Sequence, residues 1–193
     1  MYRVKEAFYT LQGEGAQAGR AAVFCRFSKC NLWTGREKDR ATAVCNFCDT
    51  DFVGTDGQNG GRFETPEELA RHIRNLWPEA PGKPYVVCTG CEPLLPLDAP
   101  LIEALHREGF EVGVETNGTL PAPEGIDWLC VSPKADAPVV LEACDELKLV
   151  YPQPLAMPER FLGIRASQYF LSPMASPSIP ETAVDEIKQS NTR

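Results

Sequence analysis

Apolar and polar positions alternate with a helical period in two segments of the chain. The first opens with Thr65, whose hydroxyl suits an N-cap, followed by Pro66 and Glu68, which complete a favourable first turn and a capping box. Residues 98–108 form the second segment, and Gly109 follows where helices commonly end. Apolar side chains recur on one face of each segment, namely Leu69, Ile73 and Leu76 in the first and Leu101, Ile102 and Leu105 in the second. This spacing predicts two helices, each with one buried face.

Short apolar runs precede, separate and follow these helices. They are typical of buried strands and lie at residues 21–27, 85–88, 111–114, 128–131, 147–150 and 169–171. Strands and helices that alternate in this way predict an α/β fold with a mostly parallel sheet, whose reactive residues gather at the carboxyl ends of the strands. The Pro/Ser-rich residues 172–180 predict a loop, and residues 180–189 a last helix.

Three of the expected strands run directly into short polar clusters. The clusters are Thr89-Gly90-Cys91-Glu92-Pro93, Glu115-Thr116-Asn117-Gly118 and Ser132-Pro133-Lys134. Any one of them is explained equally well as a turn, because Gly, Pro, Asn and Ser are common turn residues. Three such clusters in succession favour a single site ringed by strand ends.

Composition narrows the class of protein. The chain has 193 residues, a net charge of −8 and a hydrophobic share of 43%, which fits one domain with a substantial core. It contains no run of the roughly 18 to 20 apolar residues that a membrane span needs, and its acidity disfavours nucleic-acid binding. We expect a cytoplasmic protein that acts on a small molecule and has neither a nucleic acid nor a membrane as partner.

The chain contains eight cysteines but only two histidines, which excludes a site built on several histidines. Secreted disulfide scaffolds are usually shorter and begin with a signal peptide, whereas this chain opens with charged residues, so the thiols are expected to be reduced. Cys45 and Cys48 form a C-x2-C pair, and fourteen residues separate Cys30 from Cys45. Cys88 and Cys91 form a second pair. The remaining cysteines, Cys25, Cys130 and Cys144, have no partner spacing and are expected to pack as small hydrophobes.

Three interpretations of the paired cysteines remain open. A structural zinc protein would join Cys45, Cys48, Cys88 and Cys91 in one tetrahedral site, although the second pair straddles a strand end. A thioredoxin-like role needs a helix directly after a strand, which the first pair lacks. A [4Fe–4S] cluster held by three thiolates leaves one iron open to a small chelating ligand, and we favour this interpretation. The fourteen-residue loop between Cys30 and Cys45 costs only about 1 to 1.5 kcal/mol more in closure entropy than a short one. Residues 36–44 within this loop predict a solvated helix.

The sequence resembles the 7-carboxy-7-deazaguanine synthases, radical S-adenosylmethionine (SAM) enzymes of queuosine biosynthesis. The resemblance rests on four features: Phe8-Tyr9-Thr10-Leu11-Gln12-Gly13-Glu14-Gly15, Phe24-Cys25-Arg26-Phe27, the cysteine triplet followed by Asp49-Thr50-Asp51-Phe52, and the three polar clusters. The usual spacing in radical SAM enzymes is C-x3-C-x2-C, but a C-x14-C-x2-C variant occurs in a branch of this family. The resemblance implies an abbreviated, partial (β/α) barrel in one domain over residues 1–193, with residues 31–44 as an insertion in the cluster loop.

The resemblance also implies a reaction and its cofactors. The family converts 6-carboxy-5,6,7,8-tetrahydropterin to 7-carboxy-7-deazaguanine with release of ammonia, a lyase reaction that uses a [4Fe–4S] cluster, SAM and Mg²⁺. An electron from the cluster cleaves the SAM sulfonium, and the resulting 5′-deoxyadenosyl radical abstracts a substrate hydrogen. The implied partners are the pterin substrate, an electron donor such as flavodoxin or ferredoxin, and a second copy of the chain in a homodimer.

Site residues carried over from the family fall into four groups. Cys30, Cys45 and Cys48 would hold the cluster, and Thr50 would bind Mg²⁺. The substrate would meet Leu11, Gln12, Gly13, Glu14, Arg26 and Thr89. SAM would meet Phe47, Cys48, Asp49, Gly90, Cys91, Glu92, Glu115, Asn117, Ser132, Pro133, Lys134, Ser172, Pro173 and Met174. No protein side chain is expected to be catalytic beyond the cofactor-derived radical.

The sequence departs from the family pattern in four places. Cys91 stands where the family has a glycine whose backbone approaches the methionine amine, which implies a lower affinity for SAM. Pro96 and Ser172 each replace a glutamine. The family continues into a further strand and a tail that complete the substrate pocket, whereas this chain stops at Arg193, so we expect both to be absent. These departures leave open an impaired or differently specific radical SAM protein.

Overall fold

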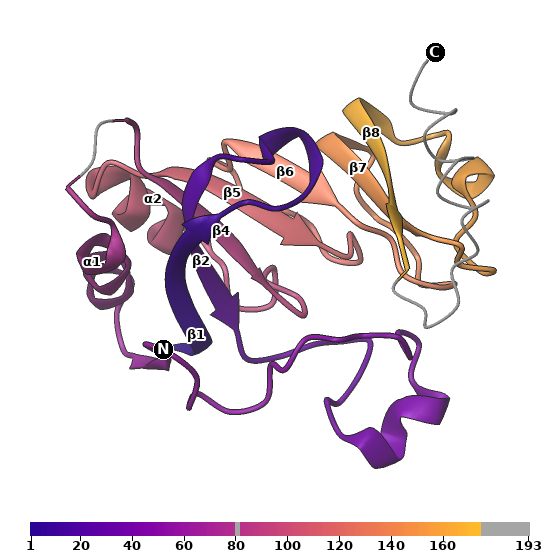
Figure 1. Cartoon of the computed structure of the whole chain (residues 1–193), viewed down its shortest axis with the longest axis horizontal. Coiled ribbons are helices and arrows are strands. Elements are labelled where there is room, and N and C mark those ends of the chain that lie inside the picture. The colour runs from indigo at the N-terminus through magenta and orange to yellow at the C-terminus, as the bar shows by residue number, and fades with distance from the viewer. Residues whose placement is uncertain (80–81, 175–193) are drawn as a thin grey trace.

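The computed structural model describes residues 1–79 and 82–174 and forms one sheet of eight strands in the order β3-β1-β2-β4-β5-β6-β7-β8 (Figure 1). The strands are β1 (Tyr2–Leu11), β2 (Ala21–Phe27), β3 (Gly61–Phe63), β4 (Tyr85–Gly90), β5 (Glu111–Thr116), β6 (Trp128–Val131), β7 (Ala143–Tyr151) and β8 (Arg165–Pro173). The helices are α1 (Pro66–Leu76), α2 (Ala99–Arg107) and the short 3-10 helices η1 (Gly15–Gln17), η2 (Glu37–Thr42) and η3 (Pro158–Phe161). Because β3 and β8 are the two edges, the barrel is open, and the predicted abbreviated (β/α) architecture is confirmed.

Six strands form parallel pairs, and β1 runs in the opposite direction to them. β2 and β4 through β8 pair in parallel, as the sequence predicts. β1 pairs antiparallel with both β2 and β3, and neither β1 nor β3 was predicted. The register between β2 and β4 sets Cys25 beside Cys88 and Arg26 beside Thr89.

Local capping explains the ends of both α-helices. Thr65 accepts a hydrogen bond from the Glu68 amide, and the Glu68 carboxylate accepts one from the Thr65 amide, so the predicted capping box is present. Asp98 caps α2, and Gly109 takes a positive φ of 87° just after it. From β5 to the end of β8 the described connections hold only the short helix η3, so the βα alternation stops after two helices. None of the described helices is long and apolar enough to cross a membrane.

Three other predictions need correction or fall outside the described residues. Ser172 and Pro173 complete β8 beside Val150 and Tyr151, so the predicted loop is wrong at these two positions. The helix expected over residues 36–44 is the shorter 3-10 helix η2. The helix expected over residues 180–189 lies outside the described residues.

The two faces of the central strands carry different kinds of side chain. One face, which includes Val23, Cys25, Val86 and Cys88, packs under α1 and α2 in the main hydrophobic core. Since neighbouring side chains on a strand point to opposite faces, Arg26, Thr89 and Glu115 lie on the other face. That face, not covered by α1 and α2, carries the polar side chains.

Candidate active site at the strand ends

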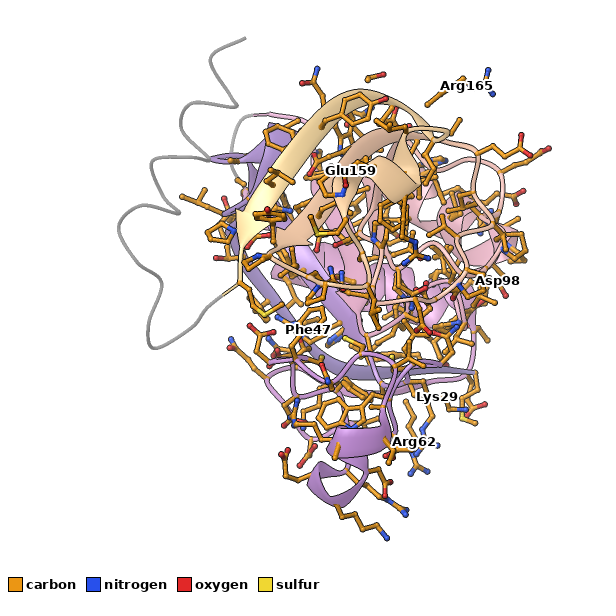
Figure 2. The ribbon with its side chains drawn as sticks, turned by 90° about the vertical axis from the view of Figure 1, so that its right-hand side faces the viewer. Lys29, Phe47, Arg62, Asp98, Glu159 and Arg165 are labelled. Carbon is orange, nitrogen blue, oxygen red and sulfur yellow. The ribbon has the colours of Figure 1, made fainter. Side chains whose placement is uncertain are left out.

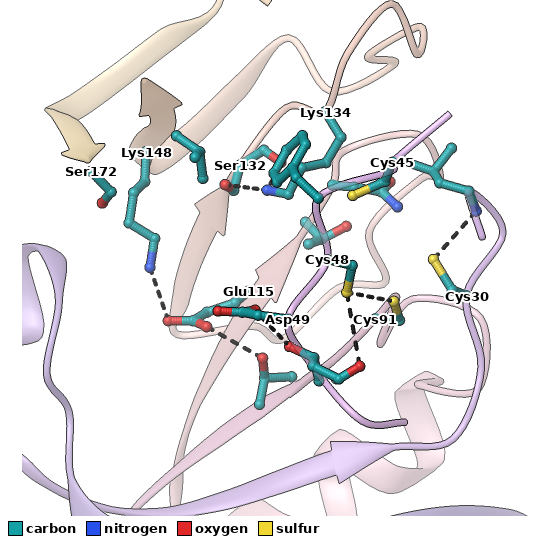
Figure 3. Close-up of a pocket in the computed structure, with 18 of the residues that line it drawn as sticks. Cys30, Cys45, Cys48, Asp49, Cys91, Glu115, Ser132, Lys134, Lys148 and Ser172 are labelled. Carbon is teal, nitrogen blue, oxygen red and sulfur yellow. Dashed lines mark hydrogen bonds and ion pairs between the residues drawn. The ribbon is translucent and has the colours of Figure 1, made fainter. Parts of the chain in front are cut away.

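A cavity of about 610 Å³ lies at the carboxyl ends of the parallel strands, where the clusters after β4, β5 and β6 meet (Figure 3). Most residues that the sequence assigned to a site line it: Glu14, Arg26, Cys30, Cys45, Phe47, Cys48, Asp49, Thr50, Thr89, Gly90, Cys91, Glu115, Asn117, Ser132, Lys134, Ser172, Pro173 and Met174. Phe47 lies between the strand ends and the loop that carries η2 (Figure 2).

Not every assigned residue reaches the cavity. Five assigned residues are absent from its lining: Leu11, Gln12, Gly13, Glu92 and Pro133. Four lining residues were not assigned: Leu32, Thr116, Lys148 and Val150. Gln12 acts from behind the cavity wall, because its Nε2 donates to Glu115 Oε1 at 3.0 Å. Leu11 and Gly13 are exposed.

The cysteines of the predicted cluster motif face this one cavity. Cys30 Sγ accepts a hydrogen bond from the Leu32 amide at 3.3 Å, and Cys48 Sγ lies 3.8 Å from Cys91 Sγ. Hydrogen bonding with the Cys91 thiol lowers the pKa of Cys30 to about 7. Hydrogen bonds with the Cys45 and Cys91 thiols also lower the pKa of Cys48. The hydrogen bond that lowers the pKa of Cys48 raises that of Cys45, so the motif thiols share their protons within the cavity.

The second C-x2-C pair is split between the two faces of the sheet. Cys88 is 0% exposed and packs in the core beside Cys25, and burial raises its pKa to about 12. Cys91 lines the cavity instead. Within the described residues, no three His, Cys, Asp or Glu side chains form a group that could hold a single metal ion. This arrangement argues against the four-thiolate zinc site. As predicted, Cys25 and Cys130 are buried, whereas Cys144 is only half-buried.

The long loop between Cys30 and Cys45 supports the other two cysteines of the motif. Arg40 in η2 donates from Nη1 to the carbonyl oxygen of Cys48 at 2.9 Å and to that of Asn46 at 3.1 Å. The Arg40 guanidinium also lies over the ring of the buried Trp33, 4.1 Å from its centroid. The inserted loop therefore braces the Cys45–Cys48 turn through its own side chains.

A buried carboxylate fixes the turns after β4 and β5. Glu92 is 0% exposed, and its carboxylate accepts hydrogen bonds from the Leu94 amide at 2.9 Å, the Thr116 hydroxyl at 2.7 Å and the Asn117 amide at 2.9 Å. Burial raises the Glu92 pKa, and these three donors oppose that effect. Glu92 therefore positions the cavity wall without lining it.

A buried lysine in the cavity lining pairs with two carboxylates that are more exposed to solvent. Lys148 Nζ lies 3.0 Å from Glu14 Oε2 and 3.3 Å from Glu115 Oε1, and its side chain is 8% exposed. Burial alone would lower the Lys148 pKa, but Glu115 and Glu14 raise it above its ordinary value. The Thr89 hydroxyl donates to the other oxygen of Glu115 at 3.2 Å. A sequence signal for Lys148 did exist, because a charged residue interrupts an apolar strand between Leu147 and Leu149.

Two further cations complete the polar lining. Arg26 Nε lies 2.8 Å from Glu6 Oε1, which anchors the guanidinium on β2. Lys134 Nζ donates to the Ser132 carbonyl at 2.7 Å and to its hydroxyl at 2.6 Å. Burial lowers the Lys134 pKa. Pro133 lies between Ser132 and Lys134 in the sequence. Its carbonyl oxygen accepts a hydrogen bond from the Gln153 side chain at 3.5 Å.

Comparison with known proteins decides the family. Residues 40–148 match the family model described as the radical SAM superfamily. A 7-carboxy-7-deazaguanine synthase of Caulobacter vibrioides is 63% identical over 176 residues, which are 91% of this chain and 84% of the relative. The chain belongs to this family of radical SAM enzymes. A second 7-carboxy-7-deazaguanine synthase, from Bordetella pertussis, is 63% identical over 177 residues, 92% of this chain and 84% of that protein.

A solved structure agrees on the fold of this 7-carboxy-7-deazaguanine synthase family member. The crystal structure of QueE from Escherichia coli matches with a TM-score of 0.65 over 98% of this chain and 88% of that chain. At 23% identity this likeness supports the fold alone. As a radical SAM family member the chain employs a [4Fe–4S] cluster and SAM, together with a small-molecule substrate and a reductant.

Proposed function

We propose that this chain converts 6-carboxy-5,6,7,8-tetrahydropterin to 7-carboxy-7-deazaguanine with release of ammonia, in the biosynthesis of a queuosine precursor. One observation carries the proposal. In a chain 63% identical to named 7-carboxy-7-deazaguanine synthases, Cys30, Cys45 and Cys48 converge on one cavity at the strand ends. The reaction class is that of a carbon–nitrogen lyase.

The cavity suits the cofactors of the family. Cys30, Cys45 and Cys48 would hold the [4Fe–4S] cluster, and the cavity beside them has room for an organic ligand. When bound, the cluster and SAM together supply a one-electron reductive cleavage that yields a carbon radical able to abstract hydrogen. The residues that would receive SAM line the same cavity as the three cysteines: Phe47, Asp49, Gly90, Cys91, Glu115, Asn117, Ser132, Lys134, Ser172, Pro173 and Met174. Glu92 and Pro133 do not line the cavity, so they would contribute to SAM binding by holding the turns to which they belong.

A positively charged residue in the cavity lining, Arg26, suits a carboxylated pterin. Arg26 lines the cavity with its Nε 2.8 Å from Glu6 Oε1, and a guanidinium can bind a carboxylate in a bidentate manner. Thr89 and Glu14 line the same cavity, and Gln12 donates a hydrogen bond to Glu115. We propose that Leu11 and Gly13 contribute through the backbone next to Gln12.

Thr50 is the proposed protein ligand for Mg²⁺. It lines the cavity beside Asp49, 3.5 Å from hydroxyl to carboxylate oxygen, so the position offers the oxygen donors that Mg²⁺ prefers. One or two protein oxygens suffice, because Mg²⁺ usually keeps several waters and binds substrate oxygens directly.

The family resemblance supports three further proposals. The reductant is a flavodoxin or ferredoxin, and the working form is a homodimer. The location is the cytoplasm, because all eight cysteines are free and that compartment keeps thiols reduced. We also propose that the chain acts as one domain in which residues 31–44 are an insertion into the cluster loop.

A turnover assay tests the proposal. Anaerobically reconstituted, reduced protein is incubated with SAM and 6-carboxy-5,6,7,8-tetrahydropterin, and 5′-deoxyadenosine and 7-carboxy-7-deazaguanine are measured together by mass spectrometry. The proposal expects both compounds. Deoxyadenosine without the deazaguanine would refute the proposed substrate and leave a SAM-cleaving enzyme of other specificity.

A further inference from the structure

Four thiols line the cavity, and the cluster motif accounts for only three of them. The fourth is Cys91, whose Sγ lies 3.8 Å from Cys48 Sγ (Figure 3). Cys91 is half-buried and faces the same space as the other three. A cluster held by the three motif thiolates would leave one iron without a protein ligand, and Cys91 is the remaining cysteine in the cavity lining.

The backbone holds Cys91 rigidly against the start of the cluster loop. Gly90 precedes it with a positive φ of 114°, and a Cβ at Gly90 would lie 2.5 Å from the Phe27 carbonyl oxygen. The strand end of β4 therefore packs directly on that of β2. On the other side of Cys91, the Glu92 amide donates to the carbonyl oxygen of Lys29 at 3.1 Å. Cys91 and Cys30 are thus tied to each other through two backbone contacts that flank Cys91.

We propose that Cys91 supplies a fourth thiolate to the [4Fe–4S] cluster while SAM is absent, and that SAM displaces it. This inference rests on the proposed function, since it needs the cluster. The exchange moves no electron. The Cys91 thiol releases a proton to solvent when its sulfur binds the iron, and takes up a proton when the amino and carboxylate groups of SAM replace it.

Two consequences distinguish a ligand from a side chain that merely occupies space. A cluster with four thiolates is coordinatively complete, so one-electron oxidation should not release its fourth iron as Fe²⁺. SAM must also compete with the thiolate, so removing the sulfur should tighten SAM binding even when the side chain keeps its size. Serine is nearly isosteric with cysteine, and it separates these two explanations.

The test compares SAM-free, anaerobically reconstituted wild type with Cys91→Ser. Each protein is oxidised with a stoichiometric amount of ferricyanide, and the [3Fe–4S] signal is measured by electron paramagnetic resonance together with released iron. We expect wild type to keep its iron and Cys91→Ser to release about one iron per cluster. In a SAM titration of the reduced cluster, the Cys91→Ser variant should bind about tenfold more tightly.

Two further variants complete the test. Cys144→Ser changes a half-buried cysteine outside the cavity and should behave as wild type in both measurements. Cys91→Gly should repeat the Cys91→Ser result and guards against a local effect of serine. Equal iron loss from wild type and Cys91→Ser would refute the ligand, and tighter SAM binding by Cys91→Gly alone would assign Cys91 a steric role. A protein that forms no cluster would overturn the proposed function as well, whereas an intact cluster with no Cys91 effect would overturn this inference alone.

Discussion

The carboxylate of Glu92 accepts a hydrogen bond from the Thr116 hydroxyl at 2.7 Å, and this contact joins the turns that follow two neighbouring strands. Both turns contribute residues to the cavity wall. A buried carboxylate with three donors is well suited to this task, because it accepts every bond and donates none.

Replacing Glu92 with glutamine should destabilise the fold. The amide group would place a donor against either the Asn117 amide or the Thr116 and Leu94 donors, so at least one buried bond is lost. We expect a loss of about 2 to 3 kcal/mol in the free energy of unfolding at pH 7, measured by urea denaturation. Glu103→Gln on the exposed side of α2 serves as control and should change little. Equal urea midpoints for wild type and Glu92→Gln would contradict this role.

Arg26→Lys should weaken substrate binding selectively. Lysine keeps the charge but loses the planar, bidentate geometry that Arg26 offers to a carboxylate. We expect the KM for the pterin to rise about tenfold or more, while SAM cleavage in the absence of substrate stays near the wild-type rate. Steady-state kinetics with both readouts check this. An unchanged KM would show that Arg26 does not bind the substrate.

Lys148→Met should affect stability and binding together. It removes the buried cation that lies 3.0 Å from Glu14 and 3.3 Å from Glu115, and because both carboxylates reach solvent we expect a cost of about 1 kcal/mol in unfolding free energy. Lys148→Arg keeps the charge and should recover most of that loss. Thermal and urea unfolding of the three proteins measure the effect, and a Met variant as stable as wild type would show that the pair is not needed for folding.

The ion pair between Arg20 and Glu111 should make stability depend on pH. Arg20 donates two hydrogen bonds to Glu111, at 2.8 and 3.0 Å, and lowers the Glu111 pKa below its ordinary 4.5. A lowered carboxylate pKa contributes stability that is fully present above pH 4.5 and is lost as the pH falls through the folded-state pKa. Wild type should therefore exceed Glu111→Gln by about 1 kcal/mol at pH 7 and lose this advantage near pH 3.

Glu67→Gln provides the matched control for this pH effect. Its partner Arg107 is also exposed, so the pair should contribute less than about 0.5 kcal/mol at either pH. Unfolding free energies from urea titrations at pH 7 and pH 3 make the comparison. A Glu111→Gln difference that persists unchanged at pH 3 would show that its cause is not the ionised carboxylate.

Features with local causes were predictable from the sequence. The capping box at Thr65 and the glycine after α2 act through residues a few positions apart, and both are present. The strand-end clusters were also predictable, because apolar runs that end in polar turns have a fixed place in a parallel sheet. The strand end could also have separated Cys88 from Cys91, since Cys88 lies within the apolar run and Cys91 in the polar cluster that follows it.

Features with distant causes were not predictable. β1 contains the buried Lys5, and the carboxylates that pair with it, Asp51 and Asp56, lie 46 and 51 residues along the chain. The charge of Lys148 within an apolar strand is visible in the sequence, but its carboxylate partners, Glu14 and Glu115, come from distant parts of the chain. In both cases the partner that permits burial is supplied by the fold and not by neighbouring residues.

Iron and sulfide analysis tests the central claim, that this cavity holds a cluster on Cys30, Cys45 and Cys48, most directly. Anaerobically purified wild type should be brown and contain about four irons and four sulfides per chain, and Cys144→Ala should match it. The triple variant with Cys30, Cys45 and Cys48 all replaced by alanine should be colourless, with native-like circular dichroism. A colourless wild type with one zinc per chain, or a triple variant that keeps its iron, would contradict the claim.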